Sequence, residues 1–212
     1  MRFASRCALV ALVCGLSSVA HAAAFSNGSF ESFNADDADE LCNGDINFCG
    51  QYNAGNTGIT GWTIGGNSVD IVGVVGWKAA HGDWSVDLSG IGAGSLSQTF
   101  DTVVGTTYRV SFEIGGNFLS GGQVMMGAAS VDGTVLPLSF DTTGSSAANM
   151  GWDSRSFDFT ATDATSTLLF VSNMNSATGL ALDNVRVTAV PEPQTVALWL
   201  AGLAGLVLRR RR

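Results

Sequence analysis

The stretch TYRVSFEI, residues 107–114, decides the fold. Apolar and polar side chains alternate along it, so that one face carries Tyr108, Val110, Phe112 and Ile114. Alternation with a period of two residues is typical of a β-strand that buries one face. RSFDFT, residues 155–160, repeats the pattern. Both stretches therefore predict half-buried strands.

Other short runs extend this pattern between residues 23 and 189. Strands are also predicted at SVDIVGVV, WSVDL, SLSQTF, GAASV, TLLFVS and DNVRVTA. Turn signals separate them, at residues 65–67, 81–83, 132–133, 143–144 and 177–179. The chain has 27 glycines, and no long helical period interrupts this region. The sequence therefore predicts one all-β domain over residues 23–189, a β-sandwich or jelly roll.

Residues 35–57 depart from the strand pattern. ADDADELCNGDINFCGQYNAGNT is polar, acidic and rich in turn-forming residues. It predicts a long surface loop with at most one helical turn near its start. Loops of this length in compact domains are usually functional or disordered.

The first 22 residues resemble a targeting segment. Arg2 and Arg6 precede an apolar run, and residues 20–22 form an A-x-A cleavage pattern. This order is typical of a secretory signal peptide that is cut near Ala22. A buried N-terminal helix and a lipoprotein signal at Cys14 are the weaker alternatives.

The charge of the predicted domain limits the classes of partner that it is expected to bind. Between residues 23 and 189 the chain carries four basic and seventeen acidic residues. Nucleic acids and anionic membrane surfaces attract clustered cations, so this domain is not expected to bind either. A strongly acidic surface instead suits an extracellular setting or cation binding.

Two cysteines remain after the signal peptide. Cys42 and Cys49 flank the short segment CNGDINFC. An even pair in an exported chain predicts a disulfide. A metal pair is the alternative, but zinc needs further ligands, and His81 is the single histidine left.

Catalytic motifs give no positive signal. His81 lies in the turn-like AHGDW, and the chain contains no G-x-S-x-G, H-E-x-x-H or P-loop sequence. Tryptophan faces can stack on sugar rings, but most tryptophans are simply buried. Trp62 and Trp84 are expected in the core. Trp77 and Trp152 flank turn-like stretches, so they are the candidate ligand-binding residues.

Two carboxylates are expected to face inward. Asp183 shares strand parity with Val185, and Glu31 shares it with Phe33. A buried carboxylate must be paired or must bind a cation. A β-bulge would be the ordinary way to turn either side chain outward.

The C-terminal segment, residues 190–212, has three parts. VPEP is followed by an apolar run, residues 196–208, and then by Arg209, Arg210, Arg211 and Arg212. This arrangement resembles a PEP-CTERM sorting signal, which exosortases of Gram-negative bacteria recognise. The resemblance implies cleavage near Pro191, Glu192 and Pro193, with the arginines left in the cytoplasm. The thirteen apolar residues would cover about 20 Å as a helix, short of the roughly 30 Å hydrocarbon core, so their length alone indicates a weak anchor. The cleavage that the resemblance implies would make the inner-membrane anchor transient.

The middle of the chain resembles the choice-of-anchor C family. The matching pieces are NGSFE, GWTI, SVDIVG, HGDWSVDLSG, GSLSQTF, TTYRVSFEIGGN, FDTTG, GWDSRSFDFTA and ALDNVRVT. That family is similar to plant cell-wall proteins with galactose-binding-like jelly rolls. The resemblance implies a galactose-binding-like β-sandwich between a signal peptide and a C-terminal hydrophobic anchor helix.

The expected function follows from both resemblances. The chain would be exported across the inner membrane, processed by an exosortase-type enzyme, and kept at the cell surface or in the extracellular matrix. A non-catalytic role is expected, structural or carbohydrate-binding in an exopolysaccharide layer. A polysaccharide-acting enzyme and a protein-binding adhesin are the alternatives.

A structural calcium ion is also expected from the resemblance. In similar carbohydrate-binding jelly rolls, an NGxFE-like start and a DNV-like end meet on neighbouring strands and share Ca²⁺. Here these pieces would supply Glu31 and Asp183, with backbone carbonyls completing the shell. Alternatively, backbone amides or Arg186 could satisfy these carboxylates, or both could simply face water.

Overall fold

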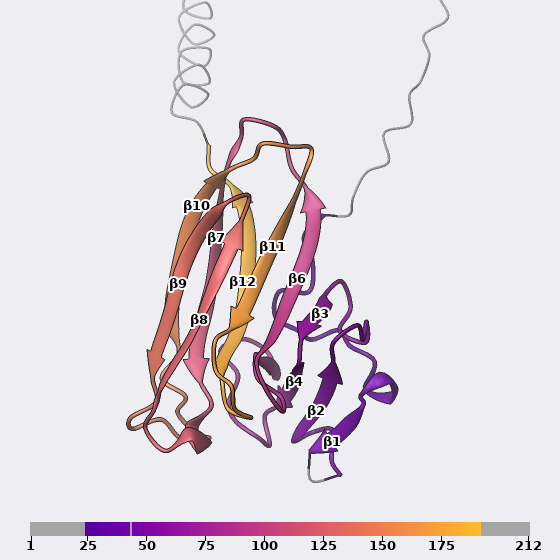
Figure 1. Ribbon diagram of the computed structural model, residues 1–212, viewed down its shortest axis with the longest axis vertical. Coiled ribbons are helices and arrows are strands. Elements are labelled where there is room, and N and C mark those ends of the chain that lie inside the picture. Colours follow the sequence, from indigo (N-terminus) through magenta and orange to yellow (C-terminus); the bar gives the residue numbers. More distant parts are fainter. Residues whose placement is uncertain (1–23, 43, 192–212) are drawn as a thin grey trace, which may run out of the picture.

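The computed structural model describes residues 24–42 and 44–191, which form a sandwich of two antiparallel sheets (Figure 1). The seven-stranded sheet has, in spatial order, β1 (Glu40–Cys42), β2 (Cys49–Asn53), β4 (Ser68–Gly73), β5 (Trp84–Asp87), β12 (Leu180–Ala189), β7 (Thr107–Gly116) and β10 (Asp153–Thr160). The five-stranded sheet has β3 (Thr63–Gly66), β6 (Gly94–Asp101), β11 (Thr165–Ser172), β8 (Val124–Val131) and β9 (Thr134–Asp141). Two 3₁₀ turns, η1 (Ala35–Asp37) and η2 (Phe118–Ser120), are the helical elements of the described ranges. The predicted all-β sandwich is confirmed.

The core lies between the two sheets, and β7 supplies its centre. Val110, Phe112 and Ile114 are each no more than 2% exposed, as the alternation in TYRVSFEI predicts. The ring of Phe112 meets that of Phe170, from β11 in the opposite sheet, edge to face with centroids 5.0 Å apart. Edge-to-face aromatic contacts of this kind add to the stabilisation from apolar burial.

Part of the segment predicted as a loop is sheet. Residues 35–57 include η1, β1 and β2, and β2 pairs with β4 along its whole length. Tyr52 anchors β2 in the core, where it is fully buried and donates a hydrogen bond from its hydroxyl to the Asn34 carbonyl at 2.9 Å. The loop prediction was wrong there, because both faces of β2 are covered and its sequence does not alternate.

Two other strands also differ from the prediction. The glycines at 65–66, expected as a turn, belong to β3, which pairs with β6. β9 was not among the predicted strands. It contains Pro137 and forms an edge of its sheet, where the missing amide of a proline is tolerated. The predicted turn at Asp132 and Gly133 is confirmed: both have positive φ and join β8 to β9.

The expected processing segments fall largely outside the described residues. The signal peptide at 1–22, Glu192, Pro193 and the arginines at 209–212 are not described, whereas Pro191 is exposed at the end of the described chain. Within residues 24–42 and 44–191, no helix has the length and apolar character needed to cross a membrane.

Candidate functional site

A row of polar residues crosses four neighbouring strands of the seven-stranded sheet. Strand register places Glu40 opposite Gln51, Gln51 opposite Asp70, and Asp70 opposite Asp87. Val69, Ile71 and Val86, the flanking residues of β4 and β5, belong to the core between the sheets. Because side chains alternate along a strand, the polar row lies on the outer face of the sheet.

The polar row forms the floor of a cleft, which we call the outer-face cleft. The cleft has a volume of about 400 Å³. Its other lining residues are the Cys42–Cys49 pair, one residue of β4, and residues of loops and of η2: Phe48, Val72, Gly76, Trp77, Gly90, Ile91, Asn117, Phe118, Leu119 and Ala177. Two of the apolar lining residues are largely open to solvent, since Ile91 is 61% and Leu119 is 66% exposed. A concave site with apolar walls and a few polar groups at its base is the usual form of a ligand pocket.

Asp87 is locked in place beneath the cleft. It is 1% exposed, and its Oδ2 accepts a hydrogen bond from Asn117 Nδ2 at 2.8 Å. Its Oδ1 accepts one from the Ser89 amide at 2.9 Å. Burial raises the pKa of Asp87 well above its ordinary value, although these hydrogen bonds oppose the rise. Asp87 therefore lies at the base of the cleft with both carboxylate oxygens already engaged.

Asp70 has a less complete environment. Within the described part of the chain its Oδ1 is buried and has no hydrogen-bond partner. Burial, and to a smaller extent the negative charge of Glu40, together raise the pKa of the Asp70 carboxyl to about 7. A buried acceptor without a donor is costly, so this oxygen favours protonation of Asp70 or a donor brought close to the carboxyl group.

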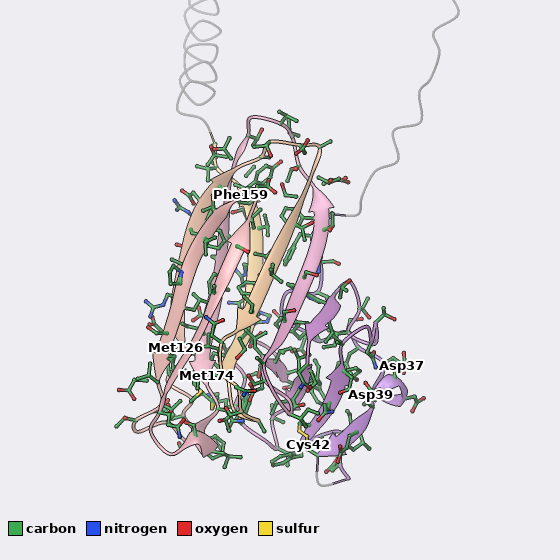
Figure 2. The ribbon with its side chains drawn as sticks, viewed as in Figure 1. Asp37, Asp39, Cys42, Met126, Phe159 and Met174 are labelled. Atoms are coloured by element: carbon green, nitrogen blue, oxygen red, sulfur yellow. A yellow bond between two sulfur atoms is a disulfide. The ribbon has the colours of Figure 1, made fainter. Side chains whose placement is uncertain are left out.

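The predicted disulfide borders the cleft. Cys42 and Cys49 are paired residues of β1 and β2, with Cα atoms 5.1 Å apart, and the structure joins their sulfurs (Figure 2). Both sulfurs and a carboxylate oxygen of Asp70 lie within 4.8 Å of one another. The disulfide prediction is confirmed, and the bond fixes the short edge strand that carries Glu40.

Trp77 lines this cleft from a buried position. It is 4% exposed, and its indole Nε1 donates a hydrogen bond to Ser85 Oγ at 2.8 Å. It packs in a second apolar cluster with Cys49, Val72, Met150 and Ala181. The expected accessibility of Trp77 was wrong, because the loop after β4 folds back over the outer face of the sheet.

Trp152 lines a separate, smaller hollow. This pocket of about 300 Å³ also includes Lys78, Glu113, Asn149 and Asn184. Trp152 is half-buried, and its Nε1 donates to the Lys78 carbonyl at 2.9 Å. Trp152 packs against the same apolar cluster as Trp77, yet the two tryptophans line different hollows. Their contact with a ligand stays a prediction.

The two carboxylates expected at a calcium site do meet the same loop. Asp183 Oδ2 accepts a hydrogen bond from the His81 amide at 2.7 Å, and Glu31 Oε1 accepts from the Asp83 and Trp84 amides at 2.9 and 3.0 Å. The expected joining of the two chain ends is also present, because the Val185 amide donates to the Gly28 carbonyl at 2.8 Å.

Strand parity predicted that Asp183 faces the core between the sheets, and this prediction was wrong. A β-bulge lies between Asp183 and Arg186, and Asn184 within it has φ 51°. Leu182 and Val185 therefore both face the core, and Asp183 lies on the outer face. Asp183 is nevertheless fully buried, because the loop containing His81 covers it. Glu31, by contrast, is exposed.

Backbone amides satisfy both carboxylates, which is one of the alternatives that the sequence left open. Burial raises the pKa of Asp183 to about 7 against the lowering effect of its amide hydrogen bonds, and the charge of Glu31 adds a smaller upward contribution. Two carboxylates that contact one loop would suit a hard cation only with further oxygen ligands. Calcium at this position stays a prediction.

Sequence reasoning missed the polar row of the outer-face cleft. Gln51 and Glu40 fell in the predicted loop, and Asp70 and Asp87 fell in strands without any separate signal. SVDIV and WSVDL each place an aspartate between apolar residues, which was the available sign of a polar outer face beside a buried one.

Solved structures with a similar arrangement are carbohydrate-binding modules. A family 35 module from Clostridium thermocellum has a TM-score of 0.46 at 14% identity, over 67% of this chain and 98% of that one. TmCBM61, solved in complex with β-1,4-galactotriose, has a TM-score of 0.45 at 16% identity, over 62% and 90%. A family 35 module from Paenibacillus barcinonensis has a TM-score of 0.43 at 19% identity, over 66% and 98%. At this level of similarity none of them assigns a ligand to this chain.

A curated relative is Halomucin of Haloquadratum walsbyi (strain DSM 16790 / HBSQ001). It is 29% identical over 202 residues, which are 90% of this chain but 2% of Halomucin. The chain thus spans a very small part of that relative's length.

Two family models divide the chain close to the predicted boundary. Residues 189–212 match the PEP-CTERM protein-sorting motif, which indicates an exported protein with a sorting signal. Residues 23–188 match the model described as "Protein of unknown function (DUF642)". The chain therefore belongs to the DUF642 family.

Proposed function

We propose that this protein is an exported, non-catalytic carbohydrate-binding protein that uses the outer-face cleft. The observation that carries the proposal is the cleft itself, in which polar groups from four strands lie between apolar side chains. Sugars present hydroxyl groups at their edges and apolar C–H groups on their faces. Gln51, Asn117 and Asp70 are suited to the hydroxyl groups, and the exposed Leu119 and Ile91 to the apolar faces.

The position of the cleft agrees with attachment through the C-terminal segment. The Val190 amide donates to the Thr107 carbonyl at the start of β7, whereas Asn117 follows the end of β7 at the cleft. β7 has ten residues, so the two ends are separated by roughly 30 Å. Figure 1 accordingly places the end of β12 far from β1 and β2. Before cleavage, a chain anchored after residue 191 would direct the cleft away from its anchor.

The finer account of export belongs to the same proposal. An exosortase-type enzyme would recognise residues 190–212 after transient insertion in the inner membrane, cut near Pro191, and release the domain to the cell surface or matrix. Within the DUF642 family, the quoted motifs would place the chain in the choice-of-anchor C group. An extracellular polysaccharide is the proposed partner.

Glycan binding is tested by arrays and calorimetry with the exported protein. Leu119→Ala, at the rim of the cleft, is expected to lower affinity at least about fivefold, because a buried apolar side chain contributes on the order of 1 kcal/mol or more. Val135→Ala is the matched control, since Val135 is 61% exposed but lies on β9 of the other sheet. The proposal fails if no glycan binds, or if both variants lose affinity equally.

A polysaccharide hydrolase is the rival function, and the paired carboxylates of Asp70 and Asp87 are the observation that favours it. Glycoside hydrolysis uses two carboxyl groups that flank the scissile bond. Asp87, however, is 1% exposed and its two oxygens already accept hydrogen bonds. Only one member of the pair is thus available to a substrate, which favours binding over hydrolysis. Release of reducing ends from the host's exopolysaccharide would support the rival.

A further inference from the structure

The ionisable groups of the outer-face cleft all have the same sign. Glu40, Asp70 and Asp87 line the cleft, and within the described ranges no lysine, arginine or histidine lines it with them. Glu40 and Asp70 face the same neighbour, Gln51, from opposite sides. An anionic sugar would therefore find no cation among these lining residues and would lie beside the exposed Glu40, which costs binding free energy.

The three carboxylates do not form a metal site. Among the described residues, the ligand group that closes within 4.8 Å contains Asp70 with the two disulfide sulfurs, and it includes neither Glu40 nor Asp87. Disulfide sulfurs are not thiolate ligands. Glu40, Gln51 and Asp70 instead offer separate acceptors on three adjacent strands, which suits a ligand that donates hydrogen bonds.

We propose that the outer-face cleft selects glycans that carry a free amino group, with the ammonium seated between Asp70 and Glu40. This inference rests on the proposed carbohydrate-binding function and specifies its ligand class. An ammonium has three N–H donors and no acceptor. Asp70, Glu40 and the side-chain carbonyl of Gln51 are acceptors on three adjacent strands, and the buried Asp70 Oδ1 lacks a donor.

Neutral sugars would bind less strongly to the same groups. A hydroxyl can donate one hydrogen bond to Asp70 but brings no positive charge to offset the negative charge of Glu40. An ammonium does both, and hydrogen bonds between charged partners are stronger than those between neutral ones. N-acetylation removes the charge and should remove this advantage.

The test compares three trisaccharides by calorimetry with the exported protein at neutral pH: β-1,4-linked glucosamine, its fully N-acetylated form, and a galacturonate. The amino form is expected to bind about tenfold or more tightly than the acetylated form, the effect of one charge-assisted hydrogen bond. Glu40→Gln and Asp70→Asn should each reduce that preference to about threefold or less. Glu40 is exposed on an edge strand, so its variant tests the inference even if Asp70→Asn folds poorly.

Asp163→Asn is the matched control for general attraction to an acidic protein. Asp163 lies between β10 and β11 and outside the cleft, so this variant should keep the full preference. Equal affinity for the amino and acetylated forms, or an equal loss in Asp163→Asn, would overturn the inference while leaving glycan binding intact. If Leu119→Ala and the wild-type protein bind none of the sugars on an array, the proposed function falls as well.

Discussion

Asp70 and Asp87 are directly paired residues of β4 and β5, and the charge of Asp70 contributes to raising the pKa of Asp87. Burial is the larger cause for both carboxyls. Their ordinary effect would be to weaken the sheet at neutral pH. Retaining two acids in such a pair is therefore a local cost that points to a role at the cleft rather than in stability.

Stability should fall as pH rises from about 4 to about 7. Asp70 has a pKa of about 7 in the folded protein against 3.8 as its model value, so the folded state holds the proton more tightly than the unfolded state. The favourable contribution is fully present below pH 4 and is lost as pH rises through about 7. Asp70→Asn should remove a pH-dependent difference on the order of 2–4 kcal/mol.

Urea unfolding at about pH 5 and about pH 8 measures that difference, since the free energy of unfolding follows from the midpoint and slope. Asp163→Asn should leave the difference between the two pH values close to that of the wild type. A wild-type protein whose unfolding free energy is equal at both pH values, or higher at the alkaline one, would contradict the prediction.

Trp77 should act as a structural residue of the cleft wall. Trp77→Ala is expected to lower the free energy of unfolding by about 3–5 kcal/mol, because it empties a buried aromatic site. Trp77→Phe leaves Ser85 Oγ without its indole donor and should cost about 1–3 kcal/mol. Adding Ser85→Ala to Trp77→Phe should restore part of that loss. Thermal or chemical unfolding tests this set, and additive effects in the double variant would argue against the hydrogen bond.

Local alternation was sufficient to predict most of the strands that bury one face, although β9 was missed. β7 is the clearest example, because its inward residues pack on the other sheet and its outward ones meet solvent or loops. β2 could not be predicted in this way, since four of its five residues are buried and no period of two is left. Covered strands resemble loops in sequence when their side chains are as polar as Gln51 and Asn53.

The candidate site depends on register, which sequence does not reveal. Glu40, Gln51, Asp70 and Asp87 come from four strands and become neighbours only once the strands are paired. The Asp183 bulge illustrates the same limit, because one irregular step changed the face of every residue before it relative to those after it.

The Cys42–Cys49 disulfide should stabilise the edge of the cleft more than the sandwich. The two residues are seven apart in sequence, so the loop-entropy model gives about 2–3 kcal/mol. In Cys42→Ser/Cys49→Ser, amide hydrogen exchange should accelerate in β1 and around Gln51, while β7 stays protected. Thiol labelling of the wild-type exported protein should find no free cysteine at these positions. Two reactive thiols would contradict the bond.

The sorting motif should be removed during export. Intact-mass analysis of the surface fraction should find a protein that begins near Ala23, the start expected after signal-peptide cleavage, and lacks Arg209–Arg212. Pro191→Ala or Glu192→Ala should leave precursor in the inner membrane, with Val135→Ala as a control for altered folding. Surface protein that keeps the four arginines would rule out the proposed processing.

Calcium should stabilise the junction between the two ends of the domain, if Glu31 and Asp183 share an ion as expected. Both carboxylates contact the loop at residues 81–84, and Asp183 carries a raised pKa because it is buried. A bound cation would favour the charged form of Asp183 and offset that cost. The melting temperature should rise when millimolar calcium is added and return to its starting value when a chelator is added. The size of the rise depends on the ratio of the calcium concentration to its Kd. Asp183→Asn should abolish the shift and Glu31→Gln should reduce it, whereas Asp70→Asn, in the outer-face cleft, should keep it. If calcium gives the same small change in all four proteins, backbone amides alone satisfy the two carboxylates.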